Sequence, residues 1–255
     1  MKTLKIVICT FLICISFAGS SEPQMPEENI VVLNDEIAQI LVFTKTMGYR
    51  HKSIEKGVET LRNLGKENNF SVTQTEDSLQ FNETNLKKYD LVLFLSTTMD
   101  VLGPDQEKAF KNYINNGGNY MGIHAASDTE YGWPWYGKLV GAYFTSHPNN
   151  PNVREAKMNV VNREHLSTAH LNDTWVRNDE WYNYKNINPD IEVLIYLDET
   201  SYEGGTNGDN HPIAWYQEFE GGRVFYTGGG HTKESYDEPD FQKHLVGGIN
   251  YCLGR

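Results

Sequence analysis

Cysteine is nearly absent from this sequence, which has only 3 cysteines among 255 residues. Small extracellular domains that depend on disulfides use many more, so that class of protein is excluded. Basic residues are also scarce, with 22 Lys and Arg against 34 Asp and Glu and a formal net charge of −12 at pH 7. Nucleic acids and anionic membrane surfaces attract basic proteins, so we expect neither as a partner. Uncharged ligands such as sugars are unaffected by this charge.

Proline is scarce as well, with 9 residues, whereas 39% of the residues are hydrophobic. This composition indicates a folded core and excludes a collagen-like or mostly disordered chain. The length allows one large domain or two small ones. Because we find no internal repeat and no linker that would divide the chain after residue 38, we predict one domain over 38–255.

The N-terminus has the order of a secretory signal peptide. Lys2 and Lys5 precede an apolar run at 6–17, and small residues follow. The run is too short to span a bilayer as a helix. We therefore predict a signal peptide at 1–20, and a mature protein that is periplasmic or secreted and has no membrane partner.

Removal of this segment also removes two of the three cysteines. Only Cys252 remains, so the mature protein has no partner for an internal disulfide and must be held together by its core. The polar and acidic stretch at 21–37 is interpreted as a linker. The sequence leaves the oligomeric state open.

The first half of the domain alternates between apolar runs and helical patterns. The runs are typical of strands buried on both faces, and we predict strands at 38–44, 70–73, 89–95 and 119–123. Ser53 is a candidate helix cap and Pro104 suits a first helical turn, so helices are expected after both. Such alternation predicts a doubly wound parallel sheet.

The second half is richer in strands. We predict extended segments at 155–161, 191–197, 213–219 and 223–227. Gly221 and Gly222 indicate a hairpin between the last two. A closing helix is expected through 241–253. The predicted fold is therefore α/β, with a mostly parallel sheet and extra strands in its C-terminal half.

Polar side chains follow three of the predicted strands. Arg50 and His51 come after the first strand, His124 directly follows the fourth, and His231 ends a glycine-rich segment after the last. Ligands of an open α/β sheet bind outside the carboxyl ends of its strands. We therefore expect Arg50, His124 and His231 to line one pocket, with His51, His147, Asp179 and Glu180 around its rim.

Each candidate also has a purely structural interpretation. Arg50 and His51 could solvate a surface loop, and His124 could be a core histidine bonded to the backbone. Three acidic residues could be solvated or cap a turn: Asp128, Asp179 and Glu180. Four aromatic residues could form either a lid or a platform for a sugar ring: Tyr131, Trp133, Trp135 and Tyr136.

Several short motifs resemble the ThuA-like (trehalose utilisation) family. In chain order they are RHKSI at 50–54, GIHAA at 122–126, KLVG at 138–141, Phe144 with HP at 147–148, DEWY at 179–182, HPIAW at 211–215 and GRVFYT at 222–227. The resemblance implies a flavodoxin-like sheet similar to that of class I glutamine amidotransferases. It also implies a role in the uptake and breakdown of trehalose and related disaccharides.

The same resemblance excludes glutamine amidotransferase activity. Those enzymes use a cysteine at the turn after a central strand, and His124 stands at that position here. Cys252, in the predicted last helix, is far along the chain. Because a glutaminase needs a thiolate, this protein should not be one.

Two functions fit these residues. The first is an enzyme that hydrolyses, eliminates or isomerises a sugar or keto-sugar, with His124 as general acid/base. Its catalytic residues would be His124, His231 and Glu180. Its substrate-binding residues would be Arg50, His51, His147, Asp179, Trp135, Tyr136 and Tyr182. The second is a sugar-binding module without catalysis.

Two further inferences limit the first hypothesis. If Asp179 and Glu180 lie in a strand, these adjacent residues point to opposite faces, which argues against an ordinary two-carboxylate glycosidase. A divalent metal on His124, His147 and His231 with a carboxylate is a variant of either function. These histidines lack the i, i+4 spacing of a zinc-binding helix, so the sequence does not favour the metal.

Overall fold

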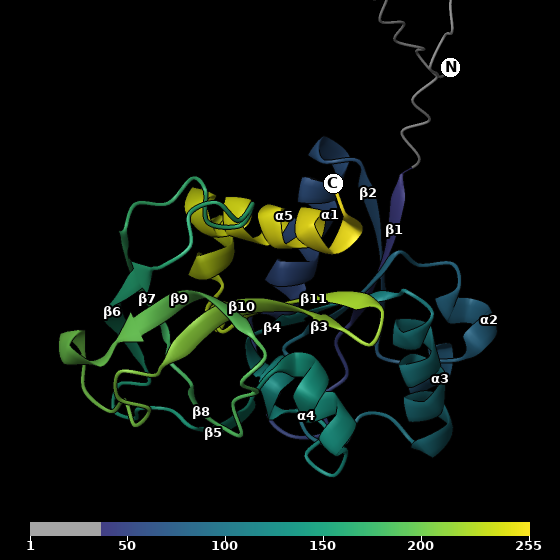
Figure 1. Ribbon diagram of the computed structural model, residues 1–255, viewed down its shortest axis with the longest axis horizontal. Helices are drawn as coiled ribbons and strands as arrows, with labels where there is room; N and C mark the ends of the chain where they lie inside the picture. Colours follow the sequence, from purple (N-terminus) through teal and green to yellow (C-terminus); the bar gives the residue numbers. More distant parts are fainter. Residues whose placement is uncertain (1–36) are drawn as a thin grey trace, which may run out of the picture. The chain divides into compact units, whose positions relative to one another are not determined.

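The computed structural model describes residues 37–255, so the predicted signal peptide and all of the predicted linker except Ile37 lie outside the described residues. The described residues form a nine-stranded sheet in the order β2-β1-β3-β4-β11-β10-β9-β6-β7 (Figure 1). Its parallel half comprises β1 (Ala38–Phe43), β2 (Phe70–Thr75), β3 (Leu91–Leu95), β4 (Asn119–Ile123) and β11 (Gly222–Thr227). The antiparallel half comprises β10 (Pro212–Phe219), β9 (Glu192–Asp198), β6 (Val153–Val160) and β7 (Thr174–Glu180).

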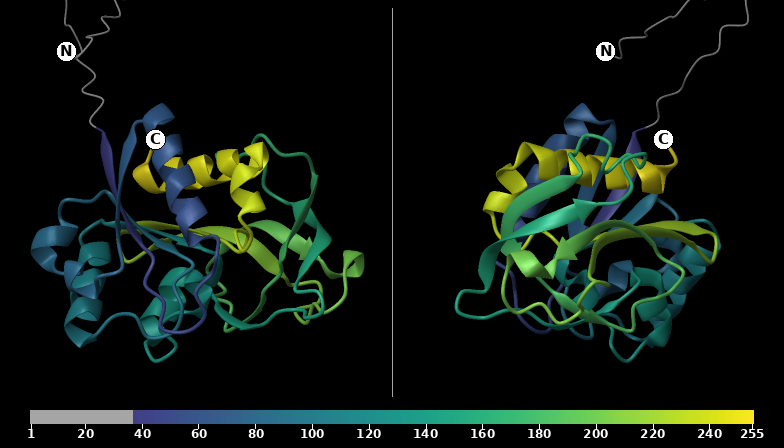
Figure 2. Two further views of the ribbon diagram at one scale, coloured as in Figure 1. Left: turned by 180° about the vertical axis from the view of Figure 1, so that it is seen from behind. Right: turned by 60° about the vertical axis from the view of Figure 1, so that its left-hand side comes forward.

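Helices cover both faces of the parallel half (Figures 1 and 2). On one face lie α1 (Ile54–Glu67) and α5 (Pro239–Leu253), and on the other α2 (Glu83–Leu86), α3 (Pro104–Asn115) and α4 (Pro134–Val140). Every residue of β3 is therefore buried, which is why this strand is apolar throughout. The predicted α/β class, with a mostly parallel sheet and extra C-terminal strands, is confirmed.

Shorter elements complete the fold. A second, two-stranded sheet pairs β5 (Tyr143–Ser146) with β8 (Asn183–Lys185). The 3-10 turns are η1 (Ser78–Gln80), η2 (His124–Asp128), η3 (Glu199–Ser201) and η4 (Glu234–Asp237). No helix among residues 37–255 combines the length and the apolarity needed to cross a membrane.

The strand β7 was not predicted from the sequence, and its position in the sheet explains why. It is an edge strand with the sequence TWVRNDE, and four of its seven residues are not buried. A strand with one partner and a solvated face needs no continuous apolar run. The predicted strand at 155–161 corresponds to β6, which pairs with β7 along its length.

The hairpin between β10 and β11 turns one residue earlier than predicted. Glu220 and Gly221 form the turn, with φ angles of 46° and 104°. Positive φ at both central residues is characteristic of the tight turns that match strand twist. Gly222 instead begins β11, where an added Cβ would lie 2.2 Å from the carbonyl oxygen of Gly118.

Strand directions bring several loops to one edge of the sheet. The strands β1, β4 and β11 are parallel, so their carboxyl ends share an edge. In the order β11, β10, β9, β6 and β7, each strand is antiparallel to the one before it. The strand β7 therefore runs in the same direction as β11. The end of β7 and the start of β6 therefore also lie at this edge, which we call the carboxyl edge.

Glu130 holds two loops together near this edge. Its side chain is buried, and its Oε1 accepts hydrogen bonds from the backbone N–H groups of Val101 (2.9 Å) and Leu102 (2.8 Å). Burial, with a smaller contribution from Asp100 and Glu107, outweighs the two N–H donors and raises the pKa of the Glu130 carboxyl to about 7. The folded protein therefore binds the carboxyl proton of Glu130 more tightly than the unfolded chain does.

The native protein should lose stability as pH rises, because Glu130 loses its proton. We expect Glu130→Gln not to show this loss. The raised pKa means that the contribution of Glu130 is fully present below its unfolded value of 4.5 and is lost as pH rises through about 7. Glutamine keeps the acceptor oxygen and has no charge. As pH rises from about 5 to about 8, the unfolding free energy of the variant should increase relative to that of the native protein by on the order of 1–3 kcal/mol.

Denaturant unfolding at several pH values measures this difference. Glu67→Gln, an exposed position in α1, is the matched control and should show no such trend. A difference between Glu130→Gln and native protein that stays constant with pH would contradict the prediction.

Candidate functional site

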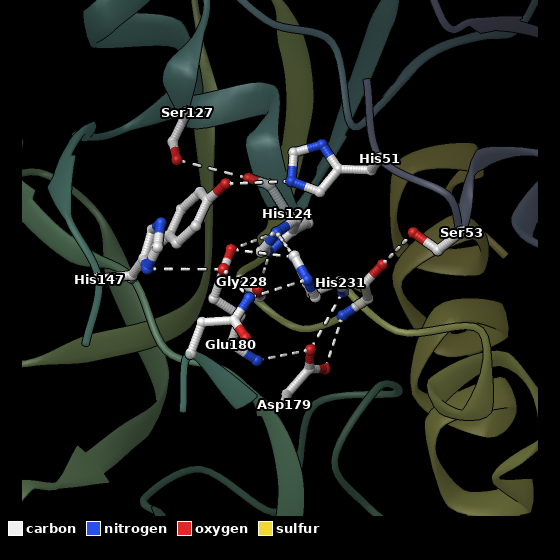
Figure 3. Close-up of polar contacts among 12 residues, drawn as sticks. His51, Ser53, His124, Ser127, His147, Asp179, Glu180, Gly228 and His231 are labelled. Carbon is white, nitrogen blue, oxygen red and sulfur yellow. Dashed lines mark hydrogen bonds and ion pairs between the residues drawn. The ribbon is translucent and has the colours of Figure 1, made fainter. Parts of the chain in front are cut away.

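Four titratable side chains meet at the carboxyl edge (Figure 3). His51 lies in the loop after β1, His124 begins η2 after β4, Glu180 ends β7, and His231 lies in the loop after β11. One ligand-type atom from each of the four lies within 4.8 Å of the others. His51, His124 and Glu180 are buried and His231 is half-buried. We call these four residues the His–Glu cluster.

The backbone at His124 adopts a strained conformation that turns the chain directly after β4. Its φ of 51° lies in the left-handed region, which is uncommon for residues other than glycine. The imidazole Nδ1 lies 2.8 Å from the carbonyl oxygen of Gly228. Since a carbonyl only accepts, Nδ1 carries the hydrogen, and Nε2 is the nitrogen that faces Glu180 and His231.

Glu180 connects the histidines. Its Oε2 lies 2.9 Å from His231 Nδ1 and 3.4 Å from His124 Nε2. Its Oε1 accepts a hydrogen bond from Asn152 Nδ2 (2.8 Å) and lies 3.5 Å from His147 Nδ1. Burial alone would raise the pKa of Glu180, but its hydrogen bonds with His124 and His231 outweigh burial and hold the pKa well below its usual range. Glu180 is therefore an anion at physiological pH.

His51 supplies a neutral imidazole. Burial, together with the neighbouring His124 and His231, lowers the pKa of His51 to about 2. Its Nε2 lies 3.4 Å from the Tyr182 hydroxyl, and its Nδ1 is buried with no hydrogen-bond partner among the described residues. The expected place of His51 at a rim is wrong, because the ring is buried inside the cluster.

Asp179 holds the loop that carries His231. Its carboxylate accepts hydrogen bonds from the backbone N–H groups of Glu180, Gly230 and His231 and from the Ser235 hydroxyl. Arg177 lies 3.3 Å from the same carboxylate. Because Asp179 is fully buried and its oxygens are occupied, it positions the loop and does not face a ligand. This corrects its predicted role in substrate binding.

The two adjacent acids therefore act on the same loop in different ways. Asp179 binds the backbone at 230–231, whereas Glu180 binds the ring of His231. Ser53 also donates to the Gly230 carbonyl (3.0 Å) and makes no side-chain bond to its own helix. Ser53, the expected helix cap, therefore links the start of α1 to the loop that carries His231.

Tyr182 and His147 lie beside the cluster. The Tyr182 ring packs against His124 with centroids 4.3 Å apart, and Phe144 packs on Tyr182 at 4.1 Å. His147 is partly exposed and approaches the outer oxygen of Glu180. Both residues therefore lie next to the catalytic candidates, and their role in binding stays a prediction.

Arg50 makes its contacts at the surface. Its guanidinium pairs with Glu55 (2.7 Å) and Glu76 (2.8 Å), and its side chain is 42% exposed. The prediction that it lines one pocket with His124 and His231 is not met, because these two carboxylates hold the side chain. The structural interpretation of Arg50 as a solvated loop residue fits better.

Trp135 and Tyr136 also lie away from the site at which the sequence placed them. The Trp135 ring N–H donates to Glu220, which lies in the turn before β11 and hence at the opposite edge of the sheet. Tyr136 is fully buried, and its hydroxyl donates to the carbonyl of Ala126. The helical segment that carries them packs against the core, so neither ring faces the His–Glu cluster.

Asn152 is a polar neighbour of the cluster that the sequence did not single out. Its amide lies between Glu180 Oε1 and His231 Nε2, at 2.8 Å and 3.4 Å. It directly precedes β6, whose Val153 pairs with Glu180 of β7. Recognition of a β6–β7 hairpin would have placed Asn152 at the carboxyl edge, but the polar sequence of β7 concealed that hairpin.

The cluster combines the Glu180 anion with three imidazoles, which suits proton transfer or metal binding. It does not suit thiol chemistry. Cys252 lies in α5, where burial raises the pKa of its thiol and Sγ contacts the Tyr120 carbonyl. His124 occupies the strand–turn position at which a thiolate would be needed.

Comparison with known structures and families identifies the fold. A ThuA-like protein from Bacteroides uniformis is 23% identical, with a TM-score of 0.72 over 85% of this chain and 91% of that chain. Another, from Parabacteroides merdae, is 18% identical, with a TM-score of 0.70 over 86% and 90%. A β-galactosidase from Bacillus circulans shares the fold over 88% of this chain but 32% of its own, at 13% identity and a TM-score of 0.57. No curated protein matches the chain. The family model described as "ThuA: Trehalose utilisation" matches residues 39–252, and the chain therefore belongs to the ThuA family.

Proposed function

We propose that this protein is an exported enzyme of carbohydrate utilisation that acts on trehalose, a related disaccharide or a keto-sugar. The family supports the substrate class. The basic, apolar and small residues in order at 1–20 support export. The observation that carries the catalytic part is the buried contact of the Glu180 carboxylate with the imidazoles of His231 and His124, at 2.9 Å and 3.4 Å.

Proton transfer is the chemistry that this arrangement supplies. The bond from His124 Nδ1 to the Gly228 carbonyl leaves Nε2 as the acceptor for a proton. The Glu180 anion favours a proton on His231 Nδ1, which lies 3.3 Å from His124 Nε2. One ring can thus take a proton from a sugar hydroxyl or carbon while the other supplies one, which is the work of general acid–base catalysis.

A sugar-binding module is the second candidate function, and one observation favours it. Tyr49 is 61% exposed, and its ring meets that of His51 edge-on with centroids 4.9 Å apart. An exposed aromatic ring beside a polar cluster can support the apolar face of a sugar.

Turnover of a sugar panel tests the proposal. We would incubate the protein with trehalose, other disaccharides and their keto derivatives and follow substrate and product by mass spectrometry. Loss of at least one substrate is expected. Glu180→Gln should lower its rate by about 10²–10⁴-fold, because the variant lacks the anion that orders the two histidines.

Glu55→Gln is the matched control, since Glu55 is exposed and pairs with Arg50 at the surface. It should leave the rate unchanged. Sugar binding without turnover would establish the binding module instead. The absence of both binding and turnover across the panel would reject a carbohydrate function, and equal rates for the two variants would reject the role of Glu180.

A further inference from the structure

We infer that the His–Glu cluster binds one divalent transition metal ion of the zinc class. His124 Nε2, His231 Nδ1 and Glu180 Oε2 are its ligands, and His51 is the fourth group within reach. The role of the ion in turnover rests on the proposed function, whereas its binding does not.

The spacing of the three ligand atoms fits such an ion. The two nitrogens are 3.3 Å apart, and Glu180 Oε2 lies 3.4 Å from His124 Nε2 and 2.9 Å from His231 Nδ1. A tetrahedral zinc ion, with bonds of about 2.0–2.1 Å to nitrogen and oxygen, separates its ligand atoms by about 3.3 Å. The three atoms are thus close to the positions that a single ion would require.

The charge balance around Glu180 also supports a bound cation. Glu180 is buried, and a buried carboxylate is costly unless a positive charge accompanies it. Among the described residues its ion-pair partners are histidines alone. The nearby Arg177 contacts Asp179 and Glu238 instead. A divalent cation among the imidazoles would supply the missing positive charge.

The surrounding contacts orient the ligands as metal sites require. His124 donates its other ring hydrogen to the Gly228 carbonyl, which directs the Nε2 lone pair into the cluster. The outer oxygen of Glu180 accepts from Asn152, which leaves Oε2 facing the histidines. Asp179 fixes the backbone at Gly230 and His231.

This ligand set differs from the one considered from sequence. His147 was the expected third histidine, but its Nδ1 lies 2.9 Å from the Pro148 carbonyl and 3.5 Å from the outer oxygen of Glu180. His51 lies inside the cluster in its place. The ligands come from separate loops at one sheet edge, so the i, i+4 spacing of a zinc-binding helix is neither present nor needed.

When bound, an ion of this class polarises a sugar oxygen or lowers the pKa of a water molecule. His124 and His231 would then hold the ion, and His147, partly exposed beside Glu180, is the imidazole left to carry a proton.

Metal titration of the untagged, chelator-stripped protein tests the inference. We expect one equivalent of Zn²⁺ to bind by calorimetry, and Co²⁺ to give the intense visible bands of a four- or five-coordinate site. X-ray absorption at the zinc edge should show imidazole ligands and a first shell at about 2.0–2.1 Å. Glu180→Gln and His231→Asn should weaken Zn²⁺ binding by about 100-fold or more.

His170→Asn is the matched control, because His170 bonds to the Asp240 carbonyl and is outside the cluster. It should bind Zn²⁺ normally. If either cluster variant fails to fold, as judged by circular dichroism, His51→Asn replaces it. Within residues 37–255 the His51 ring has one hydrogen-bond partner, the Tyr182 hydroxyl at 3.4 Å. No stoichiometric binding, or equal affinity in cluster and control variants, would overturn the inference.

The outcome for the ion and the outcome for catalysis are separable. Zinc binding without turnover of any sugar would reject the proposed function and leave the metal site standing. Turnover that persists in protein shown to be free of metal would reject the role of the ion in turnover and leave the proposed function standing, and the absence of stoichiometric Zn²⁺ binding would reject the metal site itself.

Discussion

We expect His124→Asn to lower the turnover of the sugar substrate by about 2–4 orders of magnitude while the protein stays folded. His124 Nε2 lies at the centre of the cluster, 3.3 Å from His231 Nδ1 and 3.4 Å from Glu180 Oε2. Whether this nitrogen carries a proton or holds a metal ion, asparagine lacks it. The rate should therefore collapse under either mechanism.

Asparagine is the informative replacement for two physical reasons. Its amide can still donate to the Gly228 carbonyl that His124 Nδ1 contacts at 2.8 Å. It also tolerates a left-handed backbone better than other non-glycine residues, and φ at this position is 51°. Alanine would lose the bond and be strained, so a loss of activity in His124→Ala would mix a catalytic effect with a structural one.

Thermal melts and steady-state rates, measured on the same samples, check this prediction. His170→Asn, the same change in a histidine outside the cluster, should match the native protein in both. If His124 serves only as a core histidine, the variant should lose stability by about 1–3 kcal/mol while its folded fraction keeps the native rate. That combination would contradict a role in the reaction.

The second large effect is expected on stability. Asp179→Asn should lower the free energy of unfolding by about 3–5 kcal/mol, although it adds no volume. One carboxylate oxygen accepts from the backbone of Glu180 and His231, and the other accepts from Gly230 and Ser235. An amide has a single acceptor oxygen, so its NH₂ group must face donors in either orientation.

The substitution also leaves Arg177 without the Asp179 charge. Arg177 is buried and would retain one of its two ion-pair partners among the described residues, Glu238 at 2.6 Å. Because a domain of this size loses roughly 2–4 °C per kcal/mol, the melting temperature should fall by roughly 10 °C. The loop that carries His231 should become accessible to hydrogen exchange before the rest of the protein.

Asp173→Asn provides the control for this change of chemistry. Asp173 pairs with Arg163 at the surface, and its side chain is 86% exposed. Substitutions of this kind usually change stability by less than about 0.5 kcal/mol. If Asp179→Asn melted at the temperature of Asp173→Asn, the buried network around Asp179 would not be holding the loop.

The sequence by itself determined the fold class and most of the sheet. Strands such as β1 and β3 are buried on both faces, so their apolar runs are long enough to be recognised without any tertiary information. Their alternation with helical patterns is enough to predict a doubly wound sheet. The placement of His124 and His231 followed from the same local reasoning, because His124 directly follows one predicted strand and His231 lies in the loop after another.

Only the tertiary structure decided which polar residues share a site. Glu180 reaches the two histidines because each strand from β11 to β7 reverses its neighbour, and the register of polar edge strands leaves little trace in a sequence. Arg50 is adjacent in sequence to His51 of the cluster, but its guanidinium pairs with Glu55 and Glu76 at the surface. Asp179 and Glu180 are adjacent and chemically alike, yet one binds backbone N–H groups and the other binds imidazoles. Such differences depend on contacts of a few ångströms between loops far apart in the chain, which local patterns of hydrophobicity do not encode.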